Sequence, residues 1–485
     1  MHKTYDSSLR LSSESVTGGQ TINFGYDNDD MPTSAGAMTI VRDPATGFVT
    51  GTTLGAISES RTYDVFGAEK TYTVTANGRT LYAVDYGTRD ALGRIANKTE
   101  TVQGTAHVYG YTYDSVGRLS DVTTDGNATS HYEYDANGNR LVGPGLTASP
   151  VYDNQDRLLS YGNCTYTYKA DGSLQTKTCP DGTTTYDYDA FGNLRGVGLP
   201  NGTAITYVID GQNRRVGKKI NGALVESFVY QDQLKRVGWY DGAGTLKAQF
   251  VFGRRRYVPD LMIKGGQAFK LVYDQVGTVR EVIGPDGAIS EVLDYDEFGS
   301  LLTDSAPGFQ PFGFGGGLRD VDTGLTRFGA RDYDPTAGRW TTKDPLLYRT
   351  LKAATSKGGA TKRDQGGSTP RAVRESYVYA GNNPIVSIDP SGLQPGVYDE
   401  ECGMWDSQIC ESEAEHASEA WCRCEASGGE PALVVDGTTY TSGQPRYAGV
   451  SCRHYICDEP SGYWFEAHPT SAIYWERVGG GDNCH

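Results

Sequence analysis

The chain has 485 residues, of which 63 are glycine and 33 are tyrosine, with 37% hydrophobic residues and a formal net charge of −16. No run of about 18 consecutive apolar residues occurs, so the sequence predicts no membrane-spanning helix. The first residues, MHKTYDSSLRLSSES, lack the apolar segment of a signal peptide. We therefore expect an export signal on a preceding portion of the protein or a non-Sec route.

A short pattern, Tyr-Asp-x-x-Gly, recurs along the first part of the chain. It occurs at Tyr63–Gly67, Tyr113–Gly117, Tyr134–Gly138, Tyr188–Gly192, Tyr273–Gly277 and Tyr295–Gly299. The aspartate can accept a backbone hydrogen bond two residues on, and the glycine supplies a left-handed conformation. Each pattern therefore predicts a turn between two strands.

The spacing of these turns is about one hairpin, and hairpins are stable only when neighbours pair with them. The unit after Tyr109 predicts a strand through Tyr113, a turn at 114–117, a strand at 118–123 and a turn at 125–126. The fold class is therefore all-β. Disorder is the competing prediction for a glycine-rich chain, but the regular tyrosines argue against it.

These repeats resemble the YD repeats of the RHS family, which teneurins and the C component of Tc toxins share. The resemblance covers about residues 1–393 and implies a spiral β-sheet shell, which in that family encloses a polypeptide. We expect a repeat shell in 1–305, a core plug domain in 306–393 and a variable C-terminal domain in 394–485.

The segments FGARDYDPTAGRWTTKDP and YVYAGNNPIVSIDPSGL resemble the RHS repeat-associated core domain. Members of that family that process themselves are cut just after the Gly-Leu ending. The resemblance implies cleavage between Leu393 and Gln394, with Arg331, Asp332 and Asp344 as the catalytic residues.

Two aspartates suit this chemistry, because one carboxylate can deprotonate water while one carboxylic acid protonates the leaving amide. Arg331 could hold one carboxylate ionised or orient the scissile carbonyl. The alternative is an inert plug in which the aspartates only begin turns, the role expected for Asp334 and Asp389. A Gly/Ser/Thr/Lys/Arg-rich insertion at 350–374 predicts a flexible loop that could separate the catalytic groups.

Residues 394–485 have a different composition, with 16 acidic residues, four arginines and a formal charge of −12. This charge makes nucleic acid an unlikely ligand. The sequence predicts a small α+β module with a helix at 411–426 and a hairpin turning at 436–437. His454 or His468 could do acid–base work with Asp458 or Glu466, although lone histidines are more often packing or surface residues.

Cysteine is concentrated in the same region, which predicts a disulfide-rich module that matures in an oxidising compartment. A further cross-strand disulfide is expected between Cys164 and Cys179, whose alternative is a reduced buried pair. The C-terminal candidates are Cys402, Cys410, Cys422, Cys424, Cys452, Cys457 and Cys484. Zinc is the alternative there, but the Cys-x-Cys and Cys-x-His spacings are tighter than usual. We predict no metal and no cofactor.

Taken with the resemblance, these features predict a fragment of a secreted or cell-surface RHS-type toxin. Its shell would enclose the C-terminal cargo, which aspartyl autoproteolysis after Leu393 would release. The expected partners are an immunity protein and a secretion or delivery apparatus, and the target of the cargo is not specified by the sequence. The alternative is a non-enzymatic cell-surface or adhesion protein with a disulfide-rich binding tail.

Overall fold

The structure is a computed structural model that describes residues 1–255, 257–345 and 377–393, together with strand segments at 396–397, 430–435, 438–441, 454–458, 464–467 and 475–478. The chain divides into two compact units, Met1–Thr62 with Glu69–Tyr398, and Tyr63–Ala68 with Asp399–His485. Within the described ranges, no helix is long and apolar enough to cross a membrane.

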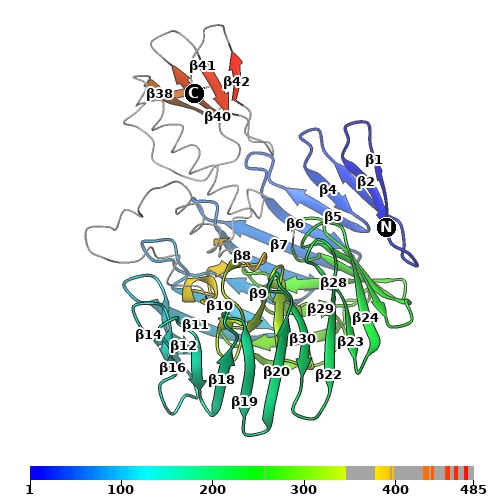
Figure 1. Cartoon of the computed structure of the whole chain (residues 1–485). Coiled ribbons are helices and arrows are strands. Elements are labelled where there is room, and N and C mark those ends of the chain that lie inside the picture. The colour runs from blue at the N-terminus through cyan, green and yellow to red at the C-terminus, as the bar shows by residue number, and fades with distance from the viewer. Residues whose placement is uncertain are drawn as a thin grey trace. The chain divides into compact units, whose positions relative to one another are not determined.

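The first large sheet has 13 strands that pair in chain order (Figure 1). Its strands are β1 (His2–Tyr5), β2 (Leu11–Ser15), β3 (Ile22–Tyr26), β4 (Pro32–Ala35), β5 (Met38–Arg42), β6 (Val49–Leu54), β7 (Ile57–Tyr63), β8 (Glu69–Ala76), β9 (Arg79–Asp85), β10 (Asn97–Val102), β11 (Thr105–Tyr113), β12 (Leu119–Thr124) and β13 (Asn127–His131). The predicted unit after Tyr109 is confirmed as β11, β12 and β13 with their two turns.

A short pair, β14 (Glu133–Tyr134) and β15 (Arg140–Val142), separates this sheet from a second one of 16 strands. The second sheet also pairs in chain order. Its strands are β16 (Val151–Tyr152), β17 (Leu158–Tyr161), β18 (Cys164–Tyr168), β19 (Leu174–Cys179), β20 (Gly182–Tyr188), β21 (Leu194–Gly198), β22 (Ala204–Ile209), β23 (Arg215–Ile220), β24 (Ala223–Tyr230), β25 (Arg236–Asp241), β26 (Leu246–Val251), β27 (Leu261–Lys264), β28 (Gln267–Tyr273), β29 (Val279–Ile283), β30 (Ile289–Tyr295) and β31 (Leu301–Asp304).

Most of the Tyr-Asp turns follow alternate strands, so they line one edge of each sheet, which we call the Asp-turn rim. The turn at 240–244 follows β25 and lies at the opposite edge. In the turn at 114–118, Oδ1 of Asp114 accepts the amide hydrogens of Val116 (3.0 Å) and Arg118 (2.9 Å). Oδ2 of Asp114 lies 2.6 Å from Nε of Arg118. The residue after the glycine therefore completes the turn.

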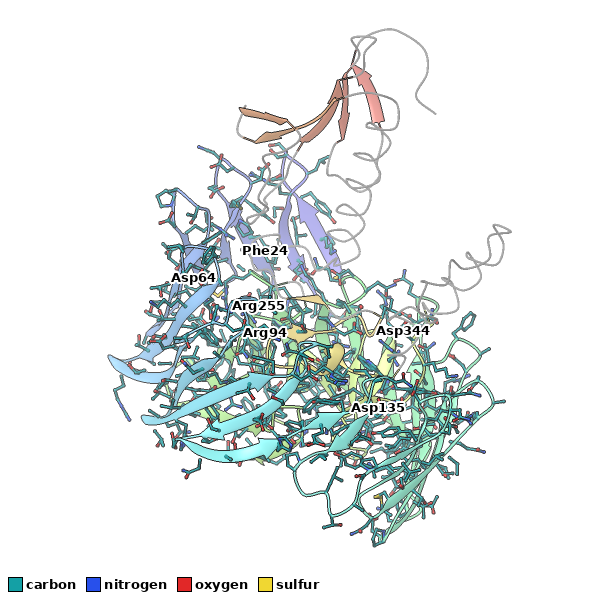
Figure 2. The ribbon with its side chains drawn as sticks, turned by 90° about the vertical axis from the view of Figure 1, so that its left-hand side faces the viewer. Phe24, Asp64, Arg94, Asp135, Arg255 and Asp344 are labelled. Atoms are coloured by element: carbon teal, nitrogen blue, oxygen red, sulfur yellow. A yellow bond between two sulfur atoms is a disulfide. The ribbon has the colours of Figure 1, made fainter. Side chains whose placement is uncertain are left out.

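Arg118 also links its turn to the next one along the rim. Its Nη1 donates to the carbonyl oxygen of Asp135 (2.7 Å), and its guanidinium lies 4.9 Å above the ring of Tyr134. Arg10 and Arg214 make the same two contacts with their own following turns. Arg94 stacks on the next tyrosine in the same way, and Figure 2 labels Arg94 and Asp135. The repeat thus builds a ladder of arginines and tyrosines.

The two large sheets share one apolar core. Ile22, Val74 and Tyr82 of the first sheet belong to the same cluster as Val272 and Ile283 of the second. A second cluster covers the inner face of β17 to β23, together with residues from beyond Asp304. Large apolar side chains from the chain itself therefore cover the inner faces of both sheets.

The core segment, residues 306–345 and 377–393 as described, is built from short elements. These are η1 (Phe314–Gly316), β32 (Leu318–Arg319), β33 (Thr326–Phe328), β34 (Arg331–Asp334), β35 (Arg339–Trp340), η2 (Ala380–Asn382) and β36 (Ser387–Ile388), the last pairing with β37 (Gly396–Val397). An aromatic cluster that includes Phe328, Tyr333, Trp340 and Tyr379 holds the segment together.

The C-terminal unit contains a five-stranded antiparallel sheet in the order β39-β38-β40-β41-β42. Its strands are β38 (Glu430–Val435), β39 (Thr438–Thr441), β40 (His454–Asp458), β41 (Trp464–Ala467) and β42 (Trp475–Val478). The pairing of β38 with β39 confirms the expected hairpin. The helix expected at 411–426 lies outside the described residues.

Candidate functional site

The last described residues of the core segment, 389–393, fold against the turn between β33 and β34, and we call them the clasp. The amide of Ala330 donates a hydrogen bond to the carbonyl oxygen of Ser391 (2.7 Å). Gly392 has a φ of +66°, and a Cβ atom there would lie 2.7 Å from the carbonyl oxygen of Phe328. Both the conformation and the close approach require glycine. The clasp is therefore docked through its backbone.

Arg331 is the centre of the site. Its Nε donates to the carbonyl oxygen of Gly392, and its Nη2 lies 3.0 Å from Oδ2 of Asp389 and 3.0 Å from Oδ2 of Asp344. The guanidinium also lies 4.2 Å above the ring of Trp340. One buried arginine therefore joins two carboxylates to a carbonyl of the clasp.

Asp389, the first residue of the clasp, is fully buried, and its Oδ1 accepts the amide hydrogen of Leu393 (3.0 Å). Burial raises the pKa of Asp389 to about 6, with Arg331 opposing the rise and Asp344 adding to it. The peptide unit between Gly392 and Leu393 is thus held at both polar atoms, its oxygen by Arg331 and its N–H by Asp389.

Asp344 is the more accessible of the two carboxylates, with 16% of its side chain exposed. Figure 2 labels it among the side chains of the core segment. Asp344 and Asp389 contact the same nitrogen of Arg331, so two carboxylates lie beside one cation. Such a pair can take a proton from water and supply one to a leaving group.

Asp332 has different surroundings, because successive residues of β34 point to opposite sides of the strand. Its Oδ1 lies 2.8 Å from Nη2 of Arg215, and its Oδ2 lies 2.9 Å from Nη1 of Arg327. All three side chains are buried. Two arginines therefore hold Asp332 in a buried ion-pair cluster that joins β34 to β23 and β33.

The predicted site residues are thus separated into two groups. Arg331 and Asp344 meet, whereas the described contacts of Asp332 lie in the arginine cluster. Asp389, which the sequence assigns to a turn, is the second carboxylate beside Arg331. Leu393 belongs to the clasp, and Gln394 and the insertion at 350–374 lie outside the described residues. Asp389 is far from Asp344 in the sequence, so their spacing gives no sign that the two carboxylates meet. The local signal for Asp389 was its place in the Asp-Pro-x-Gly-Leu ending.

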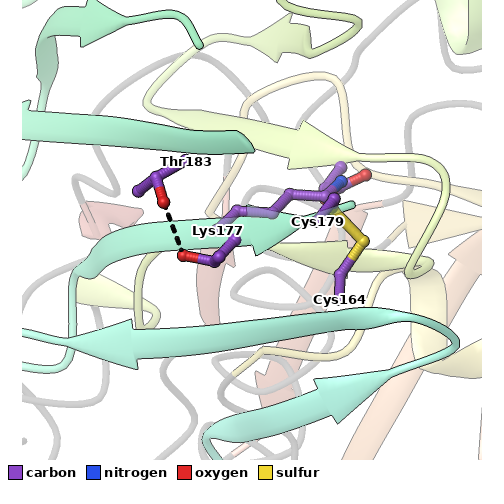
Figure 3. The surroundings of a disulfide bond; sticks show 6 residues. Cys164, Lys177, Cys179 and Thr183 are labelled. Carbon is purple, nitrogen blue, oxygen red and sulfur yellow. Dashed lines mark hydrogen bonds and ion pairs between the residues drawn. A yellow bond between two sulfur atoms is a disulfide. The ribbon is translucent and has the colours of Figure 1, made fainter. Parts of the chain in front are cut away.

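Cys164 and Cys179 form a disulfide between the neighbouring strands β18 and β19, with their Cα atoms 4.3 Å apart (Figure 3). The pairing of Thr165 with Thr178 in the ladder brings the two cysteines opposite each other. Cys457 lies in β40. The remaining candidates, Cys402, Cys410, Cys422, Cys424, Cys452 and Cys484, lie outside the described residues, as does most of the alternative zinc set.

Known proteins resemble a large part of this chain. A model of the teneurin YD-shell family matches residues 1–385. Mouse teneurin-4 is 29% identical over 345 residues, which cover 69% of this chain and 12% of teneurin-4. Zebrafish teneurin-3 is 30% identical over 309 residues, which cover 62% of this chain and 11% of teneurin-3. The tRNA3(Ser)-specific nuclease WapA of Bacillus spizizenii is 22% identical over 309 residues, covering 62% of this chain and 11% of WapA.

Solved Tc toxin structures share the fold. The Tc holotoxin pore of Photorhabdus luminescens superposes with a TM-score of 0.57 at 16% identity, covering 82% of this chain and 21% of that chain. A TcdB2–TccC3–Cdc42 complex superposes with a TM-score of 0.54 at 16% identity, covering 82% of this chain and 22% of that chain. The chain therefore spans only a small part of the proteins that it resembles. Since the family model covers most of its residues, the chain belongs to the teneurin YD-shell family.

Proposed function

We propose that the protein is a toxin-type YD shell that hydrolyses its own backbone once, between Leu393 and Gln394, and so frees residues 394–485. The observation that carries this proposal is the contact of Arg331 with Asp344, Asp389 and the Gly392 carbonyl oxygen. This contact places two carboxylates and a cation beside the last described residues of the core segment.

The clasp serves as the substrate-holding part of the reaction. Arg331 and Asp389 hold the peptide unit between Gly392 and Leu393, so the next peptide bond follows a fixed residue. Holding the reacting group in this way replaces a bimolecular encounter by an intramolecular one. The proposed scissile bond lies immediately beyond the held peptide.

The carboxylate pair supplies the proton transfers. An ionised carboxylate takes a proton from water as the water oxygen attacks the Leu393 carbonyl carbon. The protonated member of the pair then gives its proton to the amide nitrogen as the carbon–nitrogen bond breaks. The products are a carboxylate on Leu393 and an amine on Gln394. The raised pKa of Asp389, about 6, supports a proton on this carboxyl under mildly acidic conditions.

Intact-mass measurement of the purified chain tests the proposal. We expect two fragments, 1–393 and 394–485, from the wild-type chain and one uncut mass from Asp344→Asn and Asp389→Asn. Asp334→Asn is the matched control, because Asp334 is a buried aspartate of β34, the strand of Arg331, and pairs with Lys177 instead. A wild-type chain that stays intact on prolonged incubation would refute self-cleavage.

The same measurement separates two assignments within the site. Asp332→Asn should still cleave once folded, because the described contacts of Asp332 are with Arg215 and Arg327. Loss of cleavage in folded Asp332→Asn, with retention in Asp389→Asn, would instead support the pair Asp332 and Asp344. A fragment that ends at Gly392 would move the scissile bond to the held peptide.

We also propose that the protein acts outside the cell. The Cys164–Cys179 disulfide supports this location, because disulfides persist in oxidising compartments. The structural likeness to assembled Tc toxins supports a delivery partner for the shell. If residues 394–485 are toxic, the producing cell also needs an immunity protein, and expression of 394–485 inside cells tests that toxicity directly.

A non-enzymatic binding shell is the second candidate, and one observation favours it. Both oxygens of Asp389 are occupied, Oδ1 by the Leu393 amide and Oδ2 by Arg331. In this alternative the clasp only fastens the core segment, and the C-terminal unit is a binding module. An intact chain whose Asp389→Asn variant loses stability would support it.

A further inference from the structure

The residue after the glycine of each Asp-turn differs between two parts of the rim. Where the ladder continues it is arginine at Arg94 and Arg118, and Arg214 follows Asn213, which takes the left-handed place of the glycine. In four other turns this residue is small and polar, and it contacts the core segment. These contacts join Asn139 to Arg339 (2.8 Å), Asn193 to Arg327 (3.1 Å), Thr278 to Gly315 (3.1 Å) and Ser300 to Pro335 (3.3 Å).

Asn139 is the most completely engaged of the four. Its Nδ2 donates to Oδ2 of Asp135 (2.9 Å) in its own turn and to Oδ1 of Asp156 (2.7 Å) in the next turn. Its Oδ1 accepts from Nη1 of Arg339 (2.8 Å). Only 1% of Asn139 is exposed. An amide suits this place, because it both donates and accepts where an arginine only donates.

Each arginine that stacks on the tyrosine of the next turn forms one rung of the ladder. Arg339 occupies the rung that an arginine at position 139 would otherwise form. Its guanidinium lies 4.9 Å above the ring of Tyr152, the tyrosine of the next repeat. Its Nη2 donates to the carbonyl oxygen of Asp156 (2.6 Å). Arg118 makes the corresponding ring contact one turn earlier. The carbonyl contacts differ in position, because Asp135 is the first residue of its turn and Asp156 is the fourth residue of its own. The core segment thus completes the ladder with its own arginine.

This contact reaches the candidate site through a single short strand. Arg339 and Trp340 form β35, and the Trp340 ring lies 4.2 Å below the guanidinium of Arg331. The amide of Trp340 donates to the carbonyl oxygen of Tyr377 (2.9 Å), and β35 leads directly to Asp344. The placement of Arg339 therefore fixes both the support of Arg331 and the start of the segment that carries Asp344.

We propose that Asn139 is a positioning residue for the cleavage reaction: by leaving a rung of the ladder open, it selects Arg339 and so sets β35 and the Arg331–Asp344 contact. This inference rests on the proposed self-cleavage. It adds a residue in the shell, 200 positions before Arg339 and 250 before the clasp begins, that acts through Arg339 and touches neither reacting group.

The test uses the full chain and two independent readouts. The first is the rate of fragment formation by intact mass. The second is amide hydrogen exchange at Trp340 and Thr341, measured in the uncut Asp344→Asn background. The variants are Asn139→Arg, Arg339→Asn, and the exchange of both residues in one chain. Arg214→Asn is the matched control, because it removes a ladder arginine that contacts Asp210, Asp232 and Tyr230.

Asn139→Arg should slow cleavage and raise exchange at Trp340 and Thr341 about tenfold, the effect of losing one charge-assisted hydrogen bond. Arg214→Asn should lower thermal stability without either change. In the exchanged chain the rung is present again, so we expect thermal stability to recover while cleavage stays slow. A purely structural role would restore both together.

Failure of this inference differs from failure of the proposed function. A wild-type chain that never cleaves overturns the proposed function, and the exchange readout still tests how β35 is placed. Wild-type rates and unchanged exchange in folded Asn139→Arg would overturn the positioning role. Recovery of cleavage in the exchanged chain would overturn it as well.

Discussion

At the scale of single residues, Asp332 and Asp389 show how the groups around a buried aspartate determine its role. Asp332 is enclosed by Arg215 and Arg327 in a buried ion-pair cluster, which suits a structural role. Asp389 is equally buried but shares its arginine with Asp344, and its pKa is raised to about 6. Composition and spacing could not distinguish them, because the partners come from distant segments.

Glu281 is a second residue whose burial predicts a pH dependence, here of the stability of the chain. It is fully buried in β29, and neither carboxylate oxygen has a hydrogen-bond partner among the described residues. Burial raises the pKa of Glu281 to about 8, with Arg280 opposing the rise and Glu100 adding to it. Between about pH 4 and pH 8 the folded chain keeps a proton that the unfolded chain has lost. The free energy of unfolding should therefore fall as the pH rises through this range.

Glu281→Gln should remove this loss, because glutamine stays neutral. At pH 8 the variant should exceed the wild type in free energy of unfolding by a few kcal/mol, since each pKa unit is worth about 1.4 kcal/mol. The difference should shrink as the pH falls to about 5. Denaturant unfolding of the Asp344→Asn chain, which keeps the backbone uncut, checks this. The prediction is wrong if the difference in free energy of unfolding between Glu281→Gln and its parent is no larger at pH 8 than at pH 5.

At the scale of elements, the repeat explains why so many short strands persist. Each hairpin buries little by itself, but the arginine of one turn contacts the aspartate carbonyl and the tyrosine ring of the next. Neighbouring hairpins are therefore joined along the Asp-turn rim as well as through their strands. Stability then accumulates by nearest-neighbour contacts, as in other repeat proteins.

Arg118→Ala should cost about 1–2 kcal/mol of the free energy of unfolding, because it removes a partly buried ion pair, a carbonyl contact and a cation–π contact together. Denaturant unfolding in the Asp344→Asn background measures the loss. The matched control is Arg195→Ala, at an exposed position of β21, which should change stability by less than about 0.5 kcal/mol. Equal effects of the two substitutions would show that the ladder contributes nothing.

At the scale of the shell, a buried charge cluster crosses the core between the two large sheets. Oε2 of Glu59 in β7 lies 3.1 Å from Nζ of Lys270 in β28 and 3.5 Å from Nη2 of Arg254. Tyr72 donates its hydroxyl hydrogen to the same carboxylate group. Burial alone would raise the pKa of Glu59, but Lys270, Arg254 and Arg61 hold it well below its usual range.

Glu59→Gln should therefore destabilise the chain by about 3–5 kcal/mol, because it leaves buried cations without their shared anion. Glu281→Gln is its matched control, since both change a fully buried glutamate of the sheets to glutamine. At pH 8 we expect opposite signs, with loss of stability for Glu59 and gain for Glu281. Denaturant unfolding at that pH measures both. A neutral Glu59→Gln would show that the cluster does not hold the two sheets together.

The sequence by itself determined the all-β class, the turns and the repeat, because each Tyr-Asp-x-x-Gly turn is specified by residues within a few positions of one another. The same local logic brought Cys164 opposite Cys179 across neighbouring strands. It also marked the Asp-Pro-x-Gly-Leu clasp as a boundary.

Only the tertiary structure decided which carboxylates meet. Asp344 reaches Arg331 from one segment, and Asp389 and Gly392 reach it from the clasp. Arg339 reaches Asn139 from 200 positions along the chain. Strand alternation sends Asp332 to the opposite side from its neighbour Arg331. Such contacts depend on how sheets and core segment pack, and packing partners that are distant in sequence leave no periodic signal in it.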